Sequence, residues 1–97
     1  MDRDQVIRIL RDNAAELHDL GLAKLYLFGS VARGEPKPAD IDLAFEVGDN
    51  PDFSLLTQAG AMLRIEELLG RPVDLVQREC LHPRIKSRIE AEMVEVF

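Results

Sequence analysis

Residues 25–34 of this chain read Leu25-Tyr26-Leu27-Phe28-Gly29-Ser30-Val31-Ala32-Arg33-Gly34. The apolar and aromatic run that ends at Phe28 predicts a strand over residues 24–28. Gly29 follows it directly, and one turn of helix is expected over residues 30–33, closed by Gly34. The pattern therefore predicts a strand that turns through a glycine into a short helix, an arrangement that lets the backbone approach a ligand closely.

A second strand is expected shortly afterwards. The segment Glu35-Pro36-Lys37-Pro38 cannot continue a helix and predicts a loop. It is followed by Ala39-Asp40-Ile41-Asp42-Leu43, in which acidic and apolar side chains alternate, and this predicts a strand over residues 40–47. Strand residues two apart point to the same face, so Asp40 and Asp42 should share a face, about 7 Å apart at the backbone.

Two longer helices are predicted from apolar residues that recur at helical spacing. One covers residues 4–20, with Asp2 or Asp4 as its cap, and the other covers residues 53–69, with Asp52 as its cap. The inner face of the second helix is expected to consist of Leu55, Leu56, Ala59, Met62, Leu63 and Leu69.

The last third of the chain adds a strand and a helix. The strand is expected over residues 72–77, and Pro83 suits the first turn of the helix. Residues 94–97 fit either a short strand or a frayed helix end. Alternating helices and strands are typical of an α/β or α+β layer fold. The apolar stripe of the last helix is expected to be Ile85, Ile89 and Met93.

The composition fits an ordinary soluble globular protein, since 46% of the 97 residues are hydrophobic and 31% are charged. This length predicts one domain over residues 1–97. No apolar run approaches the roughly 18 residues of a membrane span. The charged start, Met1-Asp2-Arg3-Asp4, lacks the apolar core of a signal peptide. Cys80 is the only cysteine, which excludes an intrachain disulfide, and a cytoplasmic location is expected.

The formal net charge is −6. Binding to a nucleic-acid backbone depends on basic patches, so direct nucleic-acid binding is not expected. The acidic balance fits a protein partner, or a nucleotide carried in with metal ions. A small basic run, Arg84, Lys86 and Arg88, is interpreted as a solvated helix face, with contact to a partner or nucleotide as the alternative.

Gly29 and Ser30 are the first candidates for ligand binding. The free N–H groups at the start of a helix favour an anion, and the Ser30 hydroxyl could reach a phosphate oxygen. A tight turn in which Ser30 only caps the helix explains the same two residues.

Three aspartates form the second candidate site. Asp40 and Asp42 could converge on divalent cations, because carboxylate oxygens suit Mg²⁺ or Mn²⁺. Asp74 lies in the apolar run Val73-Asp74-Leu75-Val76 and would join them if the third strand neighbours the second. It could also accept the proton of an attacking hydroxyl. Aspartate is depleted in strands, yet ordinary acidic residues on an exposed strand face remain the alternative.

Together, the Gly-Ser-x-Ala-Arg-Gly string, the Asp-x-Asp strand and the later aspartate resemble the nucleotidyltransferase superfamily that includes DNA polymerase β. More narrowly, they resemble the minimal nucleotidyltransferase (MNT) proteins of prokaryotes, over nearly the whole chain. The resemblance implies an α/β (α+β) fold with a small mixed β-sheet and helices packed mainly on one face. The site should then lie at the sheet edge, near the end of the first strand.

The resemblance also implies chemistry: in-line attack on the α-phosphate of ATP, with pyrophosphate leaving. Two Mg²⁺ ions are implied, with Mn²⁺ as the alternative. Arg33 would contact the phosphates or anchor the turn. The family often has serine before the first aspartate, where this chain has Ala39, which removes a hydroxyl but no metal ligand. The implied nucleotide-binding residues are Gly29, Ser30 and Arg33, and the implied metal-binding and catalytic residues are Asp40, Asp42 and Asp74.

Proteins similar to this one usually occur as antitoxins beside a helical HEPN-domain ribonuclease, and they can add AMP to a tyrosine of that toxin. The resemblance therefore implies a protein adenylyltransferase with a HEPN-domain toxin as its partner. Two other interpretations of the function remain open. One is a non-catalytic module that inhibits its partner by covering it, and the other is a transferase that acts on a small molecule or an RNA end.

Overall fold

The computed structural model describes residues 1–36 and 40–97, so Ala39 lies outside the described residues. In chain order the elements are α1 (Arg3–Asp12), α2 (Ala14–Asp19), β1 (Lys24–Phe28), α3 (Gly29–Ala32), β2 (Ile41–Glu46), α4 (Leu55–Leu69), β3 (Val73–Gln77), the 3₁₀ turn η1 (Arg78–Cys80), α5 (Pro83–Glu92) and β4 (Val94–Glu95).

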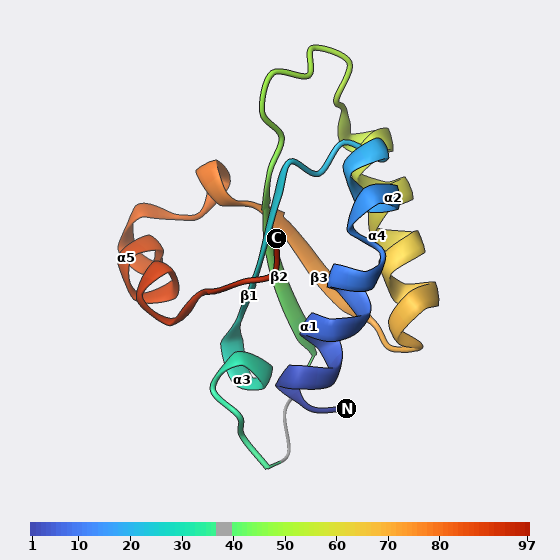
Figure 1. Cartoon of the computed structure of the whole chain (residues 1–97). Helices are drawn as coiled ribbons and strands as arrows, with labels where there is room; N and C mark the ends of the chain where they lie inside the picture. Colours follow the sequence, from blue (N-terminus) through green and yellow to red (C-terminus); the bar gives the residue numbers. More distant parts are fainter. Residues whose placement is uncertain (37–39) are drawn as a thin grey trace.

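The four strands form one mixed sheet in the order β3-β2-β1-β4. β1 is antiparallel to both β2 and β4, whereas β2 and β3 are parallel and are joined through α4. Helices α1, α2 and α4 lie on one side of the sheet, and α5 lies on the other (Figure 1). The expected small mixed sheet with helices mainly on one face is therefore confirmed.

The core lies between the sheet and α1, α2 and α4. Alternate residues of the strands point into it, because successive strand side chains point to opposite faces. The opposite face of the sheet carries both polar and apolar residues of the same strands, among them Asp42, Glu46, Phe28 and the fully buried Ala44. Fully buried core residues include Val6, Leu10, Leu17, Leu25, Leu27, Leu43, Phe45 and Ile65.

The single helix expected over residues 4–20 is wrong: the structure has two helices. Asn13 separates α1 from α2, with φ −111° and ψ 18°. Its side-chain Nδ2 donates to the Ile9 carbonyl oxygen at 2.8 Å, a local bond of the kind that competes with helix continuation. The expected cap is confirmed, because the Asp2 carboxylate accepts the Gln5 backbone N–H at 2.9 Å.

The expected inner face of α4 is wrong in its larger part. Leu55 and Leu56 are each 84% exposed and Leu63 is 57% exposed. α4 carries apolar side chains nearly all round, so helical spacing could not decide which stripe would meet the sheet. The side chains that α4 buries are Ala61, Ile65 and Leu69.

Two expected caps also differ. The cap of α4 is Ser54, whose hydroxyl accepts the Thr57 backbone N–H at 3.3 Å, and not Asp52. The short helix after β1 begins at Gly29, with Phe28 as its cap residue, so Ser30 lies inside the helix. Serine capping of that helix is therefore wrong.

At the C-terminus the expected apolar stripe of α5 holds only in part. Ile89 is buried, but Ile85 is 37% exposed and Met93 lies just beyond the helix end. The open question about residues 94–97 is resolved in favour of a strand, the two-residue β4.

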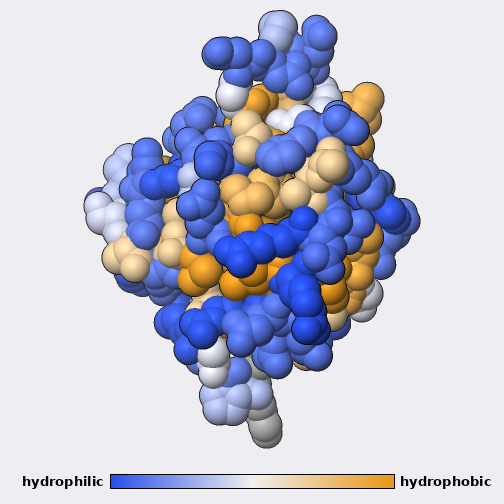
Figure 2. Space-filling view, viewed as in Figure 1, coloured by the Kyte–Doolittle hydropathy of each residue, from blue (hydrophilic) through white to orange (hydrophobic). Residues whose placement is uncertain are grey.

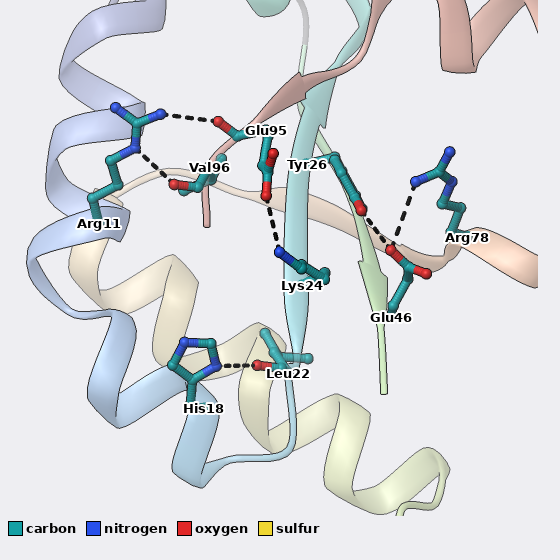
Figure 3. A network of polar contacts seen from close by, with 9 residues as sticks. All are labelled: Arg11, His18, Leu22, Lys24, Tyr26, Glu46, Arg78, Glu95 and Val96. Atoms are coloured by element: carbon teal, nitrogen blue, oxygen red, sulfur yellow. Dashed lines mark hydrogen bonds and ion pairs between the residues drawn. The ribbon is translucent and has the colours of Figure 1, made fainter. Parts of the chain in front are cut away.

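Polar contacts hold this C-terminal segment against α1 and β1 (Figure 3). Arg11 donates from Nε to the Val96 carbonyl at 2.7 Å and from Nη2 to the Glu95 carbonyl at 3.1 Å. Lys24 Nζ lies 3.1 Å from Glu95 Oε1. None of the helices in the described part of the chain is long and apolar enough to cross a membrane.

Candidate active site

The pairing of β2 with β3 brings Asp42 and Asp74 side by side. The two residues are register partners in the parallel pair, and Phe28 at the end of β1 lies opposite Asp42 on the other side. Their strand neighbours Ile41 and Val73 are buried in the core, so both aspartates belong to the opposite face. The condition under which Asp74 could join the site, that the third strand neighbours the second, is therefore met.

Asp42 is partly buried and Asp74 is exposed. The pKa of the Asp42 carboxyl is raised from its ordinary 3.8 to about 6. Burial is the largest cause, followed by the negative charges of Asp74 and Asp40 and by a hydrogen bond with Asp74, while the Arg33 guanidinium acts in the opposite direction. Asp42 is therefore a partly buried carboxyl group whose ionised form is disfavoured by its surroundings.

Asp40 lies near this pair but outside the strand pairing that aligns Asp42 with Asp74. It lies one residue before β2 and is exposed, so the same-face argument for strand residues does not extend to it. Within residues 1–36 and 40–97, no three or more His, Cys, Asp or Glu side chains are gathered so that they could hold a metal ion. Asp42 and Asp74 thus form a two-carboxylate site, which Asp40 influences through its charge.

The donor chemistry of this pair fits a hard divalent cation. Two carboxylates lie together at an edge that is open on the Asp74 side, and the pKa of Asp42 is raised by burial and by the negative charges of Asp74 and Asp40. Oxygen ligands of this kind suit Mg²⁺. A cation between them would offset the repulsion that contributes to the raised pKa of Asp42.

Gly29 connects the acidic pair to the turn after β1. Its φ is +76°, in the left-handed region that favours glycine. A Cβ at this position would lie only 2.2 Å from Asp42 Oδ2. Ser30, the next residue, is 8% exposed. The predicted phosphate-binding turn and the predicted metal site are therefore in direct contact.

Arg33 is held by two acidic side chains. Its Nη1 donates to Glu92 Oε2 at 3.0 Å and Oε1 at 3.2 Å, and its Nη2 donates to Glu35 Oε1 at 3.3 Å. Glu92 Oε1 also accepts the Gly29 backbone N–H at 3.0 Å. Sequence reasoning missed Glu92, because it lies at the far end of the chain and no local pattern connects it with Gly29.

Both histidines have structural contacts. His18 Nδ1 lies 2.8 Å from the Leu22 carbonyl oxygen (Figure 3). The His18 ring packs edge-on against Phe97, with 4.6 Å between the ring centres. His82 caps α5 by accepting the Arg84 backbone N–H at 3.1 Å. Neither bond involves the acidic pair.

Residues 6–96 match the family model described as the nucleotidyltransferase domain. The chain therefore belongs to the nucleotidyltransferase family, as its motifs predicted, and it is an enzyme of that class.

Two similar proteins have names that specify the kind of nucleotidyltransferase. A protein of Methanocaldococcus jannaschii, provisionally named a protein adenylyltransferase, is 39% identical over 79% of this chain and 82% of its own length. The protein adenylyltransferase MntA of Thermococcus cleftensis is 33% identical over 96% of this chain and 94% of its own length.

Solved structures share the fold. One, provisionally described as a minimal nucleotidyltransferase, has a TM-score of 0.78 and 33% identity, and the match covers 97% of this chain and 95% of that chain. A chain in the complex of a tri-AMPylated Shewanella oneidensis HEPN toxin with its MNT antitoxin has a TM-score of 0.66 and covers 94% of this chain and 71% of that one. At 19% identity, this second match shows likeness of fold alone.

Proposed function

We propose that this chain transfers AMP from ATP to a hydroxyl group of a partner protein. The partner we propose is a HEPN-domain toxin, the acceptor is a tyrosine, and the modification neutralises the toxin in the cytoplasm. The observation that carries the proposal is the pair Asp42 and Asp74, register partners on β2 and β3, directly against the Gly29 turn. The names of the two relatives support a protein acceptor.

Each side chain has a role in the proposed reaction. Gly29, Ser30 and Arg33 hold the triphosphate. The acceptor oxygen forms a bond to the α-phosphorus, the bond from that phosphorus to the pyrophosphate oxygen breaks, and pyrophosphate leaves with the electron pair. Asp74, the exposed member of the pair, takes the proton of the hydroxyl. Bound at Asp42 and Asp74, with Asp40 beside them, Mg²⁺ would supply charge stabilisation at the phosphate oxygens.

The environment of Tyr26, the only tyrosine of the chain, supports an acceptor on another protein. Its hydroxyl donates to Glu46 Oε2 at 2.5 Å (Figure 3), and the Arg78 guanidinium carbon lies 4.8 Å from the centre of its ring. Self-modification would require these contacts to break. A partner that brings its own hydroxyl to Asp74 meets no such obstacle.

The surface of α4 supports a protein partner. Leu55, Leu56 and Leu63 are largely exposed, and hydrophobic surface is visible over the start of α4 (Figure 2). Leu55 also lines a groove of about 360 Å³ along residues 75–77 of β3. Asp74 immediately precedes this stretch of β3. A partner seated on α4 and in the groove would therefore contact the strand that carries Asp74, and contiguous exposed apolar surface commonly marks such interfaces.

The test is intact-mass spectrometry of a HEPN-domain protein encoded beside this chain, after incubation with the chain, ATP and Mg²⁺. A mass gain of one or more AMP units is expected. The gain should be lost with Asp42→Asn and kept with Asp49→Asn, a matched change on the exposed turn after β2. An unmodified HEPN protein that still forms a stable complex would refute transfer and favour the non-catalytic binding module.

A further inference from the structure

One carboxylate, that of Glu92, contacts two of the three residues proposed to hold the triphosphate. Glu92 Oε1 accepts the Gly29 backbone N–H at 3.0 Å, and both carboxylate oxygens accept from Arg33 Nη1, at 3.2 Å and 3.0 Å. The Glu92 side chain is only 22% exposed. Hydrogen bonds between ionised partners are about twice as strong as neutral ones, so this contact fixes the turn after β1 firmly.

The backbone around Glu92 is itself fixed. Glu92 is the last residue of α5, a helix that packs against α3 and β1. Two residues later β4 pairs with β1, with Val94 opposite Leu27. Because Glu92 lies between these two anchored elements, its backbone is not part of a free loop, and its carboxylate can leave Gly29 only by a change of its own rotamer.

The contact leaves Arg33 able to bind an anion. Its guanidinium has five N–H donors. Its bonds to Glu92 come from Nη1 and its bond to Glu35 comes from Nη2, so Nε takes part in neither. Arg33 also lies close enough to Asp42 to act on the pKa of that carboxyl. A guanidinium held by Glu92 is therefore oriented beside the acidic pair with donors to spare.

We infer that Glu92 is a positioning residue of the nucleotide site: it holds the Gly29 turn and the Arg33 guanidinium in the arrangement that receives the triphosphate. The inference rests on the proposed function, because it assumes that a nucleotide binds at this turn. The opposite account is that the Glu92 carboxylate occupies donors that phosphate needs and so competes with it. The two accounts predict opposite changes in nucleotide affinity when Glu92 is removed.

The experiment is isothermal titration of the full chain with α,β-methylene-ATP and Mg²⁺, well below the unfolding midpoint of each variant. This analogue cannot transfer its adenylyl group. Glu92→Ala should weaken binding about tenfold, because it removes hydrogen bonds between charged groups. Glu92→Gln should weaken binding less, since its amide oxygen can still accept the Gly29 N–H. Glu95→Gln, which removes only the exposed ion pair with Lys24, should bind like the wild type.

A double-mutant cycle separates positioning from a general effect on folding. If Glu92 acts through Arg33, the double variant should bind the analogue less than about threefold more weakly than Arg33→Ala alone, because the effects of coupled residues are not additive. If the double variant instead loses affinity by the product of the two single losses, Glu92 does not act through Arg33. The melting temperature of each variant is measured alongside, since a merely structural role would lower it without changing the affinity of the folded fraction.

The outcomes distinguish this inference from the proposed function. If the wild type binds the analogue and Glu92→Ala binds it equally well or more tightly, the positioning role is refuted and the proposed function stands. If the wild type does not bind the analogue, both the proposed nucleotide site and the positioning role of Glu92 are refuted.

Discussion

Asp42→Asn should make the metal-free protein more stable at neutral pH. Asparagine has nearly the shape of aspartate but carries no charge, so the cost of burying the charge and the repulsion from Asp74 and Asp40 both disappear. The pKa of Asp42 rises from 3.8 to about 6, which corresponds to an upper limit of about 3 kcal/mol at 1.36 kcal/mol per pKa unit. Asp42 is only partly buried, and solvent screening reduces the expected gain to about 1 kcal/mol.

The sign of the pH dependence follows from the direction of this shift. The pKa is higher in the folded state, so between pH 3.8 and about 6 the folded protein holds a proton that the unfolded chain releases. The contribution of Asp42 to wild-type stability is therefore lost as pH rises through this window. Below it both states are protonated, and the wild type and Asp42→Asn should have similar stability. Above it the variant should keep its full advantage.

The assay is thermal unfolding followed by circular dichroism in EDTA, at pH 4 and at pH 7.5. A gain of about 1 kcal/mol corresponds to a rise in melting temperature of roughly 4–8 °C for a domain of this size, expected at pH 7.5 and nearly absent at pH 4. Asp49→Asn, on an exposed turn, should show no such difference. A variant that is less stable than the wild type at pH 7.5, or equally shifted at both pH values, would refute the electrostatic account of the pair.

Gly29→Ala should abolish AMP transfer, because the new Cβ would displace the Asp42 carboxylate, whereas Gly34→Ala has a similar positive φ of 71° but no atom within 4 Å and should keep transfer. Urea denaturation should show that backbone strain lowers the free energy of unfolding of each variant by about 1 kcal/mol, and that Gly29→Ala alone loses more. Leu56 is 84% exposed, so Leu56→Ser should change the free energy of unfolding by less than about 0.5 kcal/mol. The same variant should bind the HEPN-domain protein about tenfold more weakly in titration calorimetry, and undiminished binding would exclude Leu56 from the interface. MgCl₂ should raise the melting temperature of the wild type more than that of Asp42→Asn, and equal shifts would argue against a cation at the pair.

The order of helices and strands could be predicted from the sequence because it depends on local properties. An apolar run ending in Gly29 gives β1 and its turn, and Pro83 begins α5 as expected. The parallel pairing of β2 with β3 follows less directly, yet an intervening helix is the usual connection between parallel strands. The candidates Asp42 and Asp74 were found in this way, because a charged residue in an apolar strand is unusual.

Tertiary structure alone decided which face of α4 is buried. Leu55, Leu56 and Leu63 are as apolar as Ile65 and Leu69, so hydrophobicity could not separate the two stripes. The choice depends on how the connections from β2 and to β3 orient the helix over the sheet. This non-local constraint leaves three leucines in solvent.

The candidate site likewise depends partly on the sequence and partly on the tertiary structure. The sequence by itself determined the residue types: a glycine that permits a left-handed turn, a serine, and aspartates placed where strands begin. Only the tertiary structure set Asp42 against Gly29, paired Asp42 with Asp74, and brought Glu92 from the end of α5 to the turn after β1. Local propensity acts over a few residues, whereas these contacts join segments that meet only after the sheet has formed.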